Sequence, residues 1–331
     1  MKRTWLVMLV AAFTIGTAWG QGSVQTKKDV EYAVHDGVSL KGDIYQPTAG
    51  VGHPAIIFVH GGGFRGGSKN GYGNGWGPYL AGRGIVVFAI DYRLYTPTQP
   101  SYPQALLDCK AAVQYLRGNA AALGIDPERI GIGGDSAGAT LAELVALSQD
   151  VTALAHKYPM DPYASASTKV KVVTPMYAVQ DLMSLEMMSQ KAGKPAFEGF
   201  VGGSPEAVPG AYFEVSPLLF VRESSLKLGE LSVPNAGMKI PWFMAWGTAD
   251  KVVPPDGQSV AMAKALADAG ANVTAIPIPN QNHFWFVATQ VTGKHGEPVC
   301  EEMTGQKYTC SGPTPNDYIV DKYLDFLTKN L

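Results

Sequence analysis

Continuous apolar segments alternate with amphipathic segments along most of this chain. An unbroken apolar run is typical of a strand buried on both faces of a parallel sheet. Such runs lie within residues 54–60, 84–93, 170–178, 240–247 and 272–279, and a polar turn leads into a further buried strand within residues 126–134. Segments with the apolar spacing of helices fall at residues 79–83, 102–124, 139–149, 257–270 and 316–331. This alternation predicts an α/β fold, in which helices cover both faces of a mostly parallel central sheet.

Three segments depart from the alternation. Residues 30–47 read as two short strands joined at Asp36–Gly37, which is a hairpin turn signal. Residues 180–236 have weak periodicity, and we expect a partly helical insertion or cap over one edge of the sheet. Residues 287–313 separate the last strand from the closing helix and predict a loop at the rim. We therefore expect one domain over residues 21–331.

The first twenty residues have the pattern of a signal peptide. Two basic residues precede an apolar run at residues 5–15, and Ala18 and Gly20 occupy the positions preferred before a cleavage site. The apolar run is shorter than the roughly 20 residues that cross a bilayer. The pattern predicts a signal peptide at 1–20 and a secreted or periplasmic protein without a stable membrane anchor.

Composition excludes several classes of partner. The 26 Lys and Arg residues nearly balance the 28 Asp and Glu residues, so we expect no nucleic-acid partner. The six histidines are scattered, which gives a metal site little support, and we also expect no organic cofactor. Cys300 and Cys310 bracket a short polar stretch and are expected to form a disulfide in an oxidising compartment, whereas Cys109 is expected to be a buried free thiol. The oligomeric state is left open.

A Gly-x-Ser-x-Gly motif at residues 134–138 lies between a buried strand and a helix. In this context the serine, Ser136, sits on a sharp, strained turn that exposes its hydroxyl group. The flanking glycines remove Cβ atoms that would collide with neighbouring backbone. Ala137 places a backbone N–H at the start of the helix, where negative charge is favoured. The pentapeptide alone also fits a glycine-rich strand end with an incidental serine. We interpret Asp135, which precedes the serine, as a structural residue.

A second glycine-rich segment, His60-Gly61-Gly62-Gly63-Phe64, directly follows the first buried strand. Glycines let backbone N–H groups approach a negatively charged oxygen closely. Gly62, Gly63 and Ala137 are therefore candidate donors to the oxyanion of a tetrahedral intermediate. His60 is expected to shape this turn by hydrogen bonding rather than to take part in catalysis.

A nucleophilic serine needs a base and an acid, and two strand ends near the C-terminus supply them. His283 follows the strand at 272–279, and Asp250 follows the strand at 240–247. The order Ser136, Asp250, His283 is that of α/β-hydrolase triads, in which the aspartate orients the imidazole that accepts the serine proton. Asp256 is an alternative acid, although its place in a helix-start pattern favours a cap.

Several segments together resemble the α/β-hydrolase carboxylesterases related to hormone-sensitive lipase and to the bifunctional acetylxylan/feruloyl esterases. They are HGGGFRGGSKN, DYRL, YPQALLDCKAAVQYLRGNAAALGIDPERIGIGGDSAGATLA and GTADKVVP, and the resemblance covers roughly residues 30–285. It implies an α/β-hydrolase fold, a triad of Ser136, Asp250 and His283, and an oxyanion hole of Gly62, Gly63 and Ala137.

The sequence departs from the family pattern at Phe64, where tryptophan is frequent, at Ala139–Thr140, where a glycine is frequent, and in the cysteine-bearing segment near the C-terminus. These departures leave the chemistry intact and bear on the substrate.

Aromatic residues close to the motifs are candidate substrate-binding residues, because they suit an aryl or short-chain ester. They are Phe64, Trp76, Tyr92, Phe284 and Trp285. Packing between the loops explains most of these rings equally well. We expect a secreted serine esterase whose partner is a small-molecule or polymer-attached ester of the short-chain or aryl kind, such as an acetyl or feruloyl ester. A peptidase or amidase on the same fold, or a binding protein without activity, are the alternatives.

Overall fold

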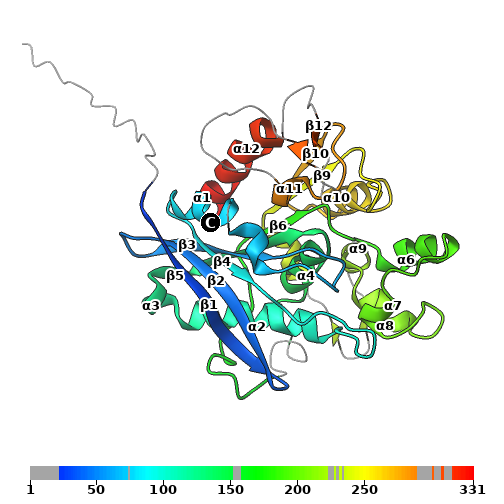
Figure 1. The fold of residues 1–331 in the computed structure, drawn as a ribbon, viewed down its shortest axis with the longest axis horizontal. Coiled ribbons are helices and arrows are strands. Elements are labelled where there is room, and N and C mark those ends of the chain that lie inside the picture. Colours follow the sequence, from blue (N-terminus) through cyan, green and yellow to red (C-terminus); the bar gives the residue numbers. More distant parts are fainter. Residues whose placement is uncertain are drawn as a thin grey trace, which may run out of the picture.

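The structure is a computed structural model, and it describes residues 22–73, 75–151, 158–222, 227–228, 231–232, 235–288, 300–301, 307–308 and 315–331. An eight-stranded sheet in the order β1-β2-β4-β3-β5-β6-β9-β10 passes through the molecule (Figure 1). β1 is antiparallel to β2, and β2 to β4, whereas the remaining neighbours are parallel. This topology confirms the α/β-hydrolase fold.

The strands lie where the apolar segments predict them. Their bounds are β1 Val24–His35, β2 Val38–Pro47, β3 His53–Val59, β4 Val86–Ile90, β5 Ile125–Asp135, β6 Val173–Met176, β9 Trp242–Gly247 and β10 Val273–Ile278. All residues of β4, β6 and β9 are buried, which explains their continuous apolar runs. β10 lies at the edge of the sheet and is buried only at Ile276 and Ile278.

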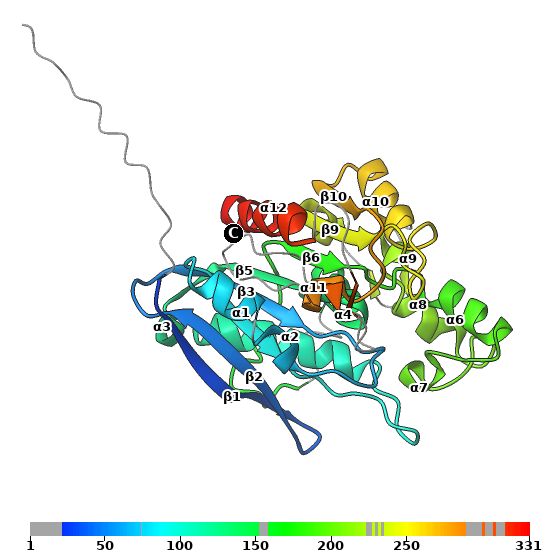
Figure 2. The ribbon, with the colours of Figure 1, turned by 45° about the horizontal axis from the view of Figure 1, so that its top comes forward.

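Helices cover both faces of the sheet. They are α1 Trp76–Ala81, α2 Gln104–Gly118, α3 Ala120–Leu123, α4 Ser136–Ser148, α6 Leu182–Lys191, α7 Glu198–Val201, α8 Pro209–Glu214, α9 Pro217–Arg222, α10 Ser259–Asp268, α11 Trp285–Ala288 and α12 Pro315–Asn330, with 3-10 helices at Lys69–Tyr72 and Asn235–Lys239. Figure 2 shows α12 and α2 on opposite sides of the sheet. Trp76 of α1 contacts Tyr323 of α12 edge-on, so these two helices share a face. α4 is buried along its whole length, as its apolar composition requires.

Residues 181–222 carry α6 to α9, and we call them the helical insertion. In both ribbon views α6, α7 and α8 lie at one side of the molecule, beside the sheet rather than within it (Figures 1 and 2). Their helical structure agrees with the partly helical segment predicted from the sequence at 180–236, and their role as a cap stays a prediction.

Two expected features lie outside the described residues. The signal peptide at 1–20 is one, and the side chains of the pair Cys300 and Cys310 are the other. In the rim segment the described backbone forms a short antiparallel ladder of β11 Cys300–Glu301 with β12 Lys307–Tyr308, and a similar ladder joins β7 Lys227–Leu228 to β8 Leu231–Ser232.

Cys109 is a buried free thiol, as predicted, and burial raises its pKa well above the ordinary value. None of the helices in the described part of the chain is long and apolar enough to cross a membrane. Within the same residues, no group of three or more His, Cys, Asp or Glu side chains is arranged to hold a metal ion.

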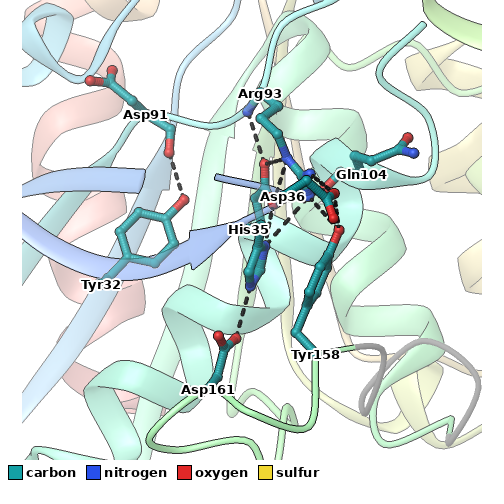
Figure 3. A network of polar contacts seen from close by, with 9 residues as sticks. Tyr32, His35, Asp36, Asp91, Arg93, Gln104, Tyr158 and Asp161 are labelled. Atoms are coloured by element: carbon teal, nitrogen blue, oxygen red, sulfur yellow. Dashed lines mark hydrogen bonds and ion pairs between the residues drawn. The ribbon is translucent and has the colours of Figure 1, made fainter. Parts of the chain in front are cut away.

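A buried polar cluster joins the β1–β2 hairpin to α2 (Figure 3). His35 lies 2.7 Å from Asp108 through Nδ1 and 2.8 Å from Asp161 through Nε2. Arg93 binds Asp108 at 2.6 Å and Asp36 at 2.6 Å. Burial lowers the pKa of His35, but the two carboxylates outweigh it and raise the pKa above its ordinary value of 6.5. Each imidazole nitrogen faces a carboxylate oxygen, an arrangement that favours the charged ring. The cluster fastens the antiparallel edge of the sheet.

Candidate active site

Ser136 lies on a strained turn between β5 and α4. Asp135 is extended, with φ −124° and ψ 146°, whereas Ser136 has φ +51°, a region that a residue with a side chain rarely adopts. A Cβ atom on Gly134 or Gly138 would lie 2.2 or 2.1 Å from the Val59 carbonyl oxygen. The two glycines therefore let the turn pack against β3, as the Gly-x-Ser-x-Gly pattern predicts.

A chain of hydrogen bonds runs from the serine to an aspartate. His283 Nε2 lies 2.9 Å from Ser136 Oγ, and His283 Nδ1 lies 2.6 Å from Asp250 Oδ2. The other oxygen, Asp250 Oδ1, accepts the backbone N–H groups of Val252 and Val253, both at 2.9 Å. Because the carboxylate accepts from Nδ1–H, Nε2 carries the lone pair that faces the serine hydroxyl. The arrangement thus allows the imidazole to take the hydroxyl proton.

The alternative acid, Asp256, is exposed and lies outside this chain of hydrogen bonds. The expectation that it caps α10 is wrong, because the residue at the N-cap is Gln258 and no side chain caps the helix there. The helix begins at Ser259, two residues later than the pattern suggested.

Two glycines in the loop after β3 have positive φ angles, which residues with a side chain rarely adopt. Gly62 has φ +121° and Gly63 has φ +60°. A Cβ atom on Gly62 would lie 2.2 Å from the Gly66 carbonyl oxygen. The Gly62 carbonyl accepts N–H groups from Arg65 and Gly66, and within the described residues the N–H groups of Gly62 and Gly63 have no acceptor. Since β3 pairs with β5, these two donors belong to the loop beside Ser136.

Asp135 joins this loop to the serine turn. Its Oδ1 accepts the Gly61 N–H at 3.0 Å and the Tyr72 hydroxyl at 2.5 Å. A Cβ atom on Gly61 would lie 2.4 Å from Asp135 Oδ2, so only glycine allows this approach. Complete burial raises the pKa of Asp135 despite these hydrogen bonds. Asp135 thus has the structural role expected of it, because it holds the glycine-rich loop against the serine turn. Its hydrogen bond with Tyr72 was missed, since the two residues lie 63 positions apart in the sequence.

His60 shapes the start of the same loop. Its Nδ1 lies 2.7 Å from the Gly61 carbonyl oxygen, and its ring stacks on Tyr92 with centroids 4.5 Å apart. Tyr92 in turn donates its hydroxyl proton to the His60 carbonyl oxygen at 2.9 Å. Burial lowers the pKa of His60, which favours a neutral ring that holds the turn.

Most of the predicted substrate-binding rings are buried. Phe64, Trp76, Tyr92 and Trp285 have exposed fractions of 0, 1, 4 and 5%. The indole of Trp76, for example, donates to the Phe286 carbonyl oxygen and stacks on the Phe286 ring at 4.7 Å. Phe64 and Trp76 expose at most 1% of their surface, which favours the packing interpretation for these two rings. Tyr92 and Trp285 are almost as buried as Ser136 itself, which is 7% exposed, so their role in substrate binding stays a prediction. Phe284 is only partly buried and lies edge-on against His283, with ring centroids 4.5 Å apart.

Sequence reasoning missed two residues that support the histidine. Tyr177 directly follows β6, has φ +39°, and packs its ring 4.5 Å from the His283 ring and 5.5 Å from that of Trp285. Thr140 of α4 fixes the same segment, because its hydroxyl accepts from the Val179 N–H and donates to the Val179 carbonyl, both at 3.0 Å. Tyr177 could have been recognised from the sequence by its position at the carboxyl end of a parallel strand, where site residues gather. Thr140 gives a structural reason for one departure from the family pattern.

Comparisons with known proteins find similarity to esterases and carboxylic ester hydrolases. The esterase LipQ of Mycobacterium tuberculosis is 33% identical over 210 residues, which make up 63% of this chain and 45% of LipQ. The probable carboxylic ester hydrolase LipM of the same organism is 25% identical over 77% of this chain and 54% of its own. This chain therefore spans about half the length of the curated relatives it matches.

Two solved structures are similar over most of the chain. A truncated carbohydrate esterase from gut microbiota matches with a TM-score of 0.64 and 26% identity, over 80% of this chain and 90% of its own. Thermogutta terrifontis esterase 2 phosphorylated by paraoxon matches with a TM-score of 0.59 and 26% identity, over 81% and 86%. The BD-FAE family model matches residues 42–266, and the chain belongs to the BD-FAE family.

Proposed function

We propose that this protein is a serine esterase that hydrolyses carboxylic esters through an acyl-enzyme. One observation carries the proposal: the unbroken hydrogen-bonded chain of Ser136, His283 and Asp250 at the carboxyl ends of three strands. The esterase names of LipQ and of the similar solved structures support it. No step of the reaction needs a metal ion or an organic cofactor.

In the first half-reaction Ser136 Oγ attacks the ester carbonyl carbon while His283 Nε2 accepts the hydroxyl proton. The tetrahedral intermediate collapses, the alcohol leaves with the proton from Nε2, and an ester bond joins the acyl group to Ser136. In the second half-reaction His283 takes a proton from water, and the hydroxide attacks the acyl carbon. The acid then leaves, and Ser136 regains its proton. Asp250 stabilises the imidazolium ion at both stages.

The negative oxygen of each intermediate needs hydrogen-bond donors that exist before the reaction begins. We assign this role to the backbone N–H groups of Gly62, Gly63 and Ala137. The first two have no acceptor within the described residues, and the third lies at the N-terminus of α4, next to Ser136. Losing one such donor typically reduces the rate by about 10²–10³-fold.

For the substrate we propose short-chain or aryl esters of the acetyl or feruloyl type. Partly exposed Phe284 beside His283 supports this choice, as does the carbohydrate esterase among the similar structures. Acetyl, butyryl and feruloyl esters, assayed with wild type and with Ser136→Ala, test the proposal. We expect hydrolysis of at least one of them by wild type and its loss in the variant. Full activity of Ser136→Ala, or a preference for an aminoacyl anilide over p-nitrophenyl acetate, would contradict it.

We also propose that the protein is exported after cleavage of residues 1–20 and that Cys300 pairs with Cys310. The basic and apolar pattern of the N-terminus and the spacing of the two cysteines support these proposals. N-terminal sequencing of the protein recovered outside the cytoplasm should begin at Gln21. Mass spectrometry without reductant should find the two cysteine-containing peptides linked, and detection of two free thiols would contradict the pairing.

A further inference from the structure

The proposed oxyanion loop ends on an unusual aromatic residue. Phe64 directly follows Gly63 and has φ +61°, although it carries a large side chain. Residues other than glycine are disfavoured in this left-handed region, so surrounding contacts have to hold the conformation. The ring of Phe64 is fully buried. Its neighbours therefore decide whether the loop keeps its shape.

Two aromatic neighbours of Phe64 come from the helical insertion. The ring of Phe200, in α7, stacks on that of Phe64 with centroids 3.8 Å apart and planes 5° apart. Phe197 meets the same ring edge-on at 6.1 Å and 71°. Parallel and edge-on aromatic contacts from two sides fix both the position and the tilt of a ring.

α7 is itself held in place by the loop between β4 and α2. The Phe200 carbonyl oxygen accepts the backbone N–H groups of Ser101 and Tyr102 at 3.2 and 3.1 Å. The same loop reaches Phe64, because the Tyr95 N–H donates to the Phe64 carbonyl oxygen at 3.0 Å. One loop thus binds both partners of the Phe64–Phe200 stack.

Two further contacts fix the start and the middle of α7. Buried Glu186 accepts the N–H groups of Ala196 and Phe197, at 2.9 and 2.8 Å, through Oε2. Gly199 lies so close to the Tyr95 ring that a Cβ atom would be 2.4 Å from it. α7 therefore has no freedom to shift without disturbing the stack.

We propose that Phe200 is a positioning residue for the oxyanion donors: through the Phe64 ring it sets the direction of the Gly62 and Gly63 N–H groups. The inference rests on the proposed function of this site. The donors act on a charge that exists only in the transition state, and displacements of about 1 Å reduce rates by about 10²-fold. The helical insertion is then part of the catalytic assembly.

Phe200→Ala tests the inference through steady-state kinetics with an activated ester. We expect kcat to fall about 10- to 100-fold while KM changes little, because the donors bind the transition state rather than the ester. Phe200→Leu keeps most of the side-chain volume but lacks a flat ring, so its kcat should lie between those of wild type and Phe200→Ala. Phe213→Ala is the matched control, since Phe213 belongs to α8 of the same insertion and is 44% exposed. Its kinetics should equal those of wild type.

An aryl trifluoromethyl ketone separates positioning from loss of folded protein. Its adduct with the serine carries an oxyanion, so its inhibition constant should rise by the factor by which kcat/KM falls. Partial unfolding would instead lower the number of titrated sites without changing that constant. A rise in KM alone would overturn the inference, because it would mean that Phe200 contributes to substrate binding.

Hydrogen exchange measured by mass spectrometry needs no activity and so remains decisive if the esterase proposal fails. Backbone amides of residues 61–66 should exchange faster in Phe200→Ala than in wild type or Phe213→Ala. Unchanged exchange in this segment would overturn the inference even if the enzyme proved to be an esterase. Absence of any ester hydrolysis by the wild-type protein would instead refute the proposed function.

Discussion

Replacing Asp250 by asparagine removes a charge but keeps the shape of the side chain. The two backbone N–H groups of Val252 and Val253, at 2.9 Å from Oδ1, select the amide oxygen of the asparagine for that position. The opposite rotamer of the asparagine would turn its NH₂ group toward these two backbone N–H groups and leave both without an acceptor. The free-energy cost is about 1–3 kcal/mol for each unpaired donor, or about 2–6 kcal/mol for the two. The NH₂ group therefore faces His283 Nδ1.

An NH₂ group facing Nδ1 forces the imidazole into the other tautomer. Nε2 then carries the proton and points it at Ser136 Oγ, 2.9 Å away, so it has no lone pair to accept the serine proton. Loss of this function in a serine triad lowers kcat by about 10⁴-fold, which corresponds to about 5.4 kcal/mol in the barrier. The urea midpoint should change little, because both N–H groups of the turn keep their acceptor.

The assay is kcat/KM for p-nitrophenyl acetate in Asp250→Asn and in the control Asp256→Asn, whose side chain is exposed. We expect a loss of about 10⁴-fold in the first variant and wild-type activity in the second. A loss below about 10-fold in Asp250→Asn, or an equal loss in both variants, would refute the tautomer argument.

Three further predictions concern the framework of the site and of the sheet. Gly138→Ala places a Cβ atom 2.1 Å from a backbone oxygen of β3 and should lower kcat/KM by about 10²-fold, while Gly210→Ala, with nothing within 4 Å, should leave it unchanged. Thr140→Val leaves the buried backbone groups of Val179 unpaired and should lower the free energy of unfolding in urea by about 1–3 kcal/mol, whereas no loss would mean that the hydroxyl contributes nothing. His35→Gln should be less stable than wild type below pH 6.5, and this difference should shrink as the pH rises through the raised pKa of His35, because the charged imidazole then loses its proton. A difference that grows with pH would exclude the charged histidine.

The sequence predicted the sheet because burial on both faces leaves an unmistakable apolar run. β4, β6 and β9 are buried at every position and were placed within a few residues. The hydrogen-bonded chain at the site was also predictable, since parallel strands bring their carboxyl ends to one edge whatever their separation in sequence.

Side-chain packing was not predictable in the same way. The ring of Trp76 next to the glycine-rich loop looks the same in sequence whether it lines a pocket or packs on Phe286, and only its burial decides. The partner of Phe64 lies in the helical insertion, in a segment without clear periodicity. Contacts of this kind join residues more than a hundred positions apart, and no local pattern records them.

The central claim is that Ser136 becomes acylated during turnover. Rapid quenching of the reaction with p-nitrophenyl acetate, followed by digestion and mass spectrometry, measures this directly. We expect one acetyl group on the peptide that contains Ser136, formed during the burst of p-nitrophenol and absent from Ser136→Ala. Turnover without an acylated Ser136 peptide, or the same acetylation in Ser136→Ala, would contradict the account.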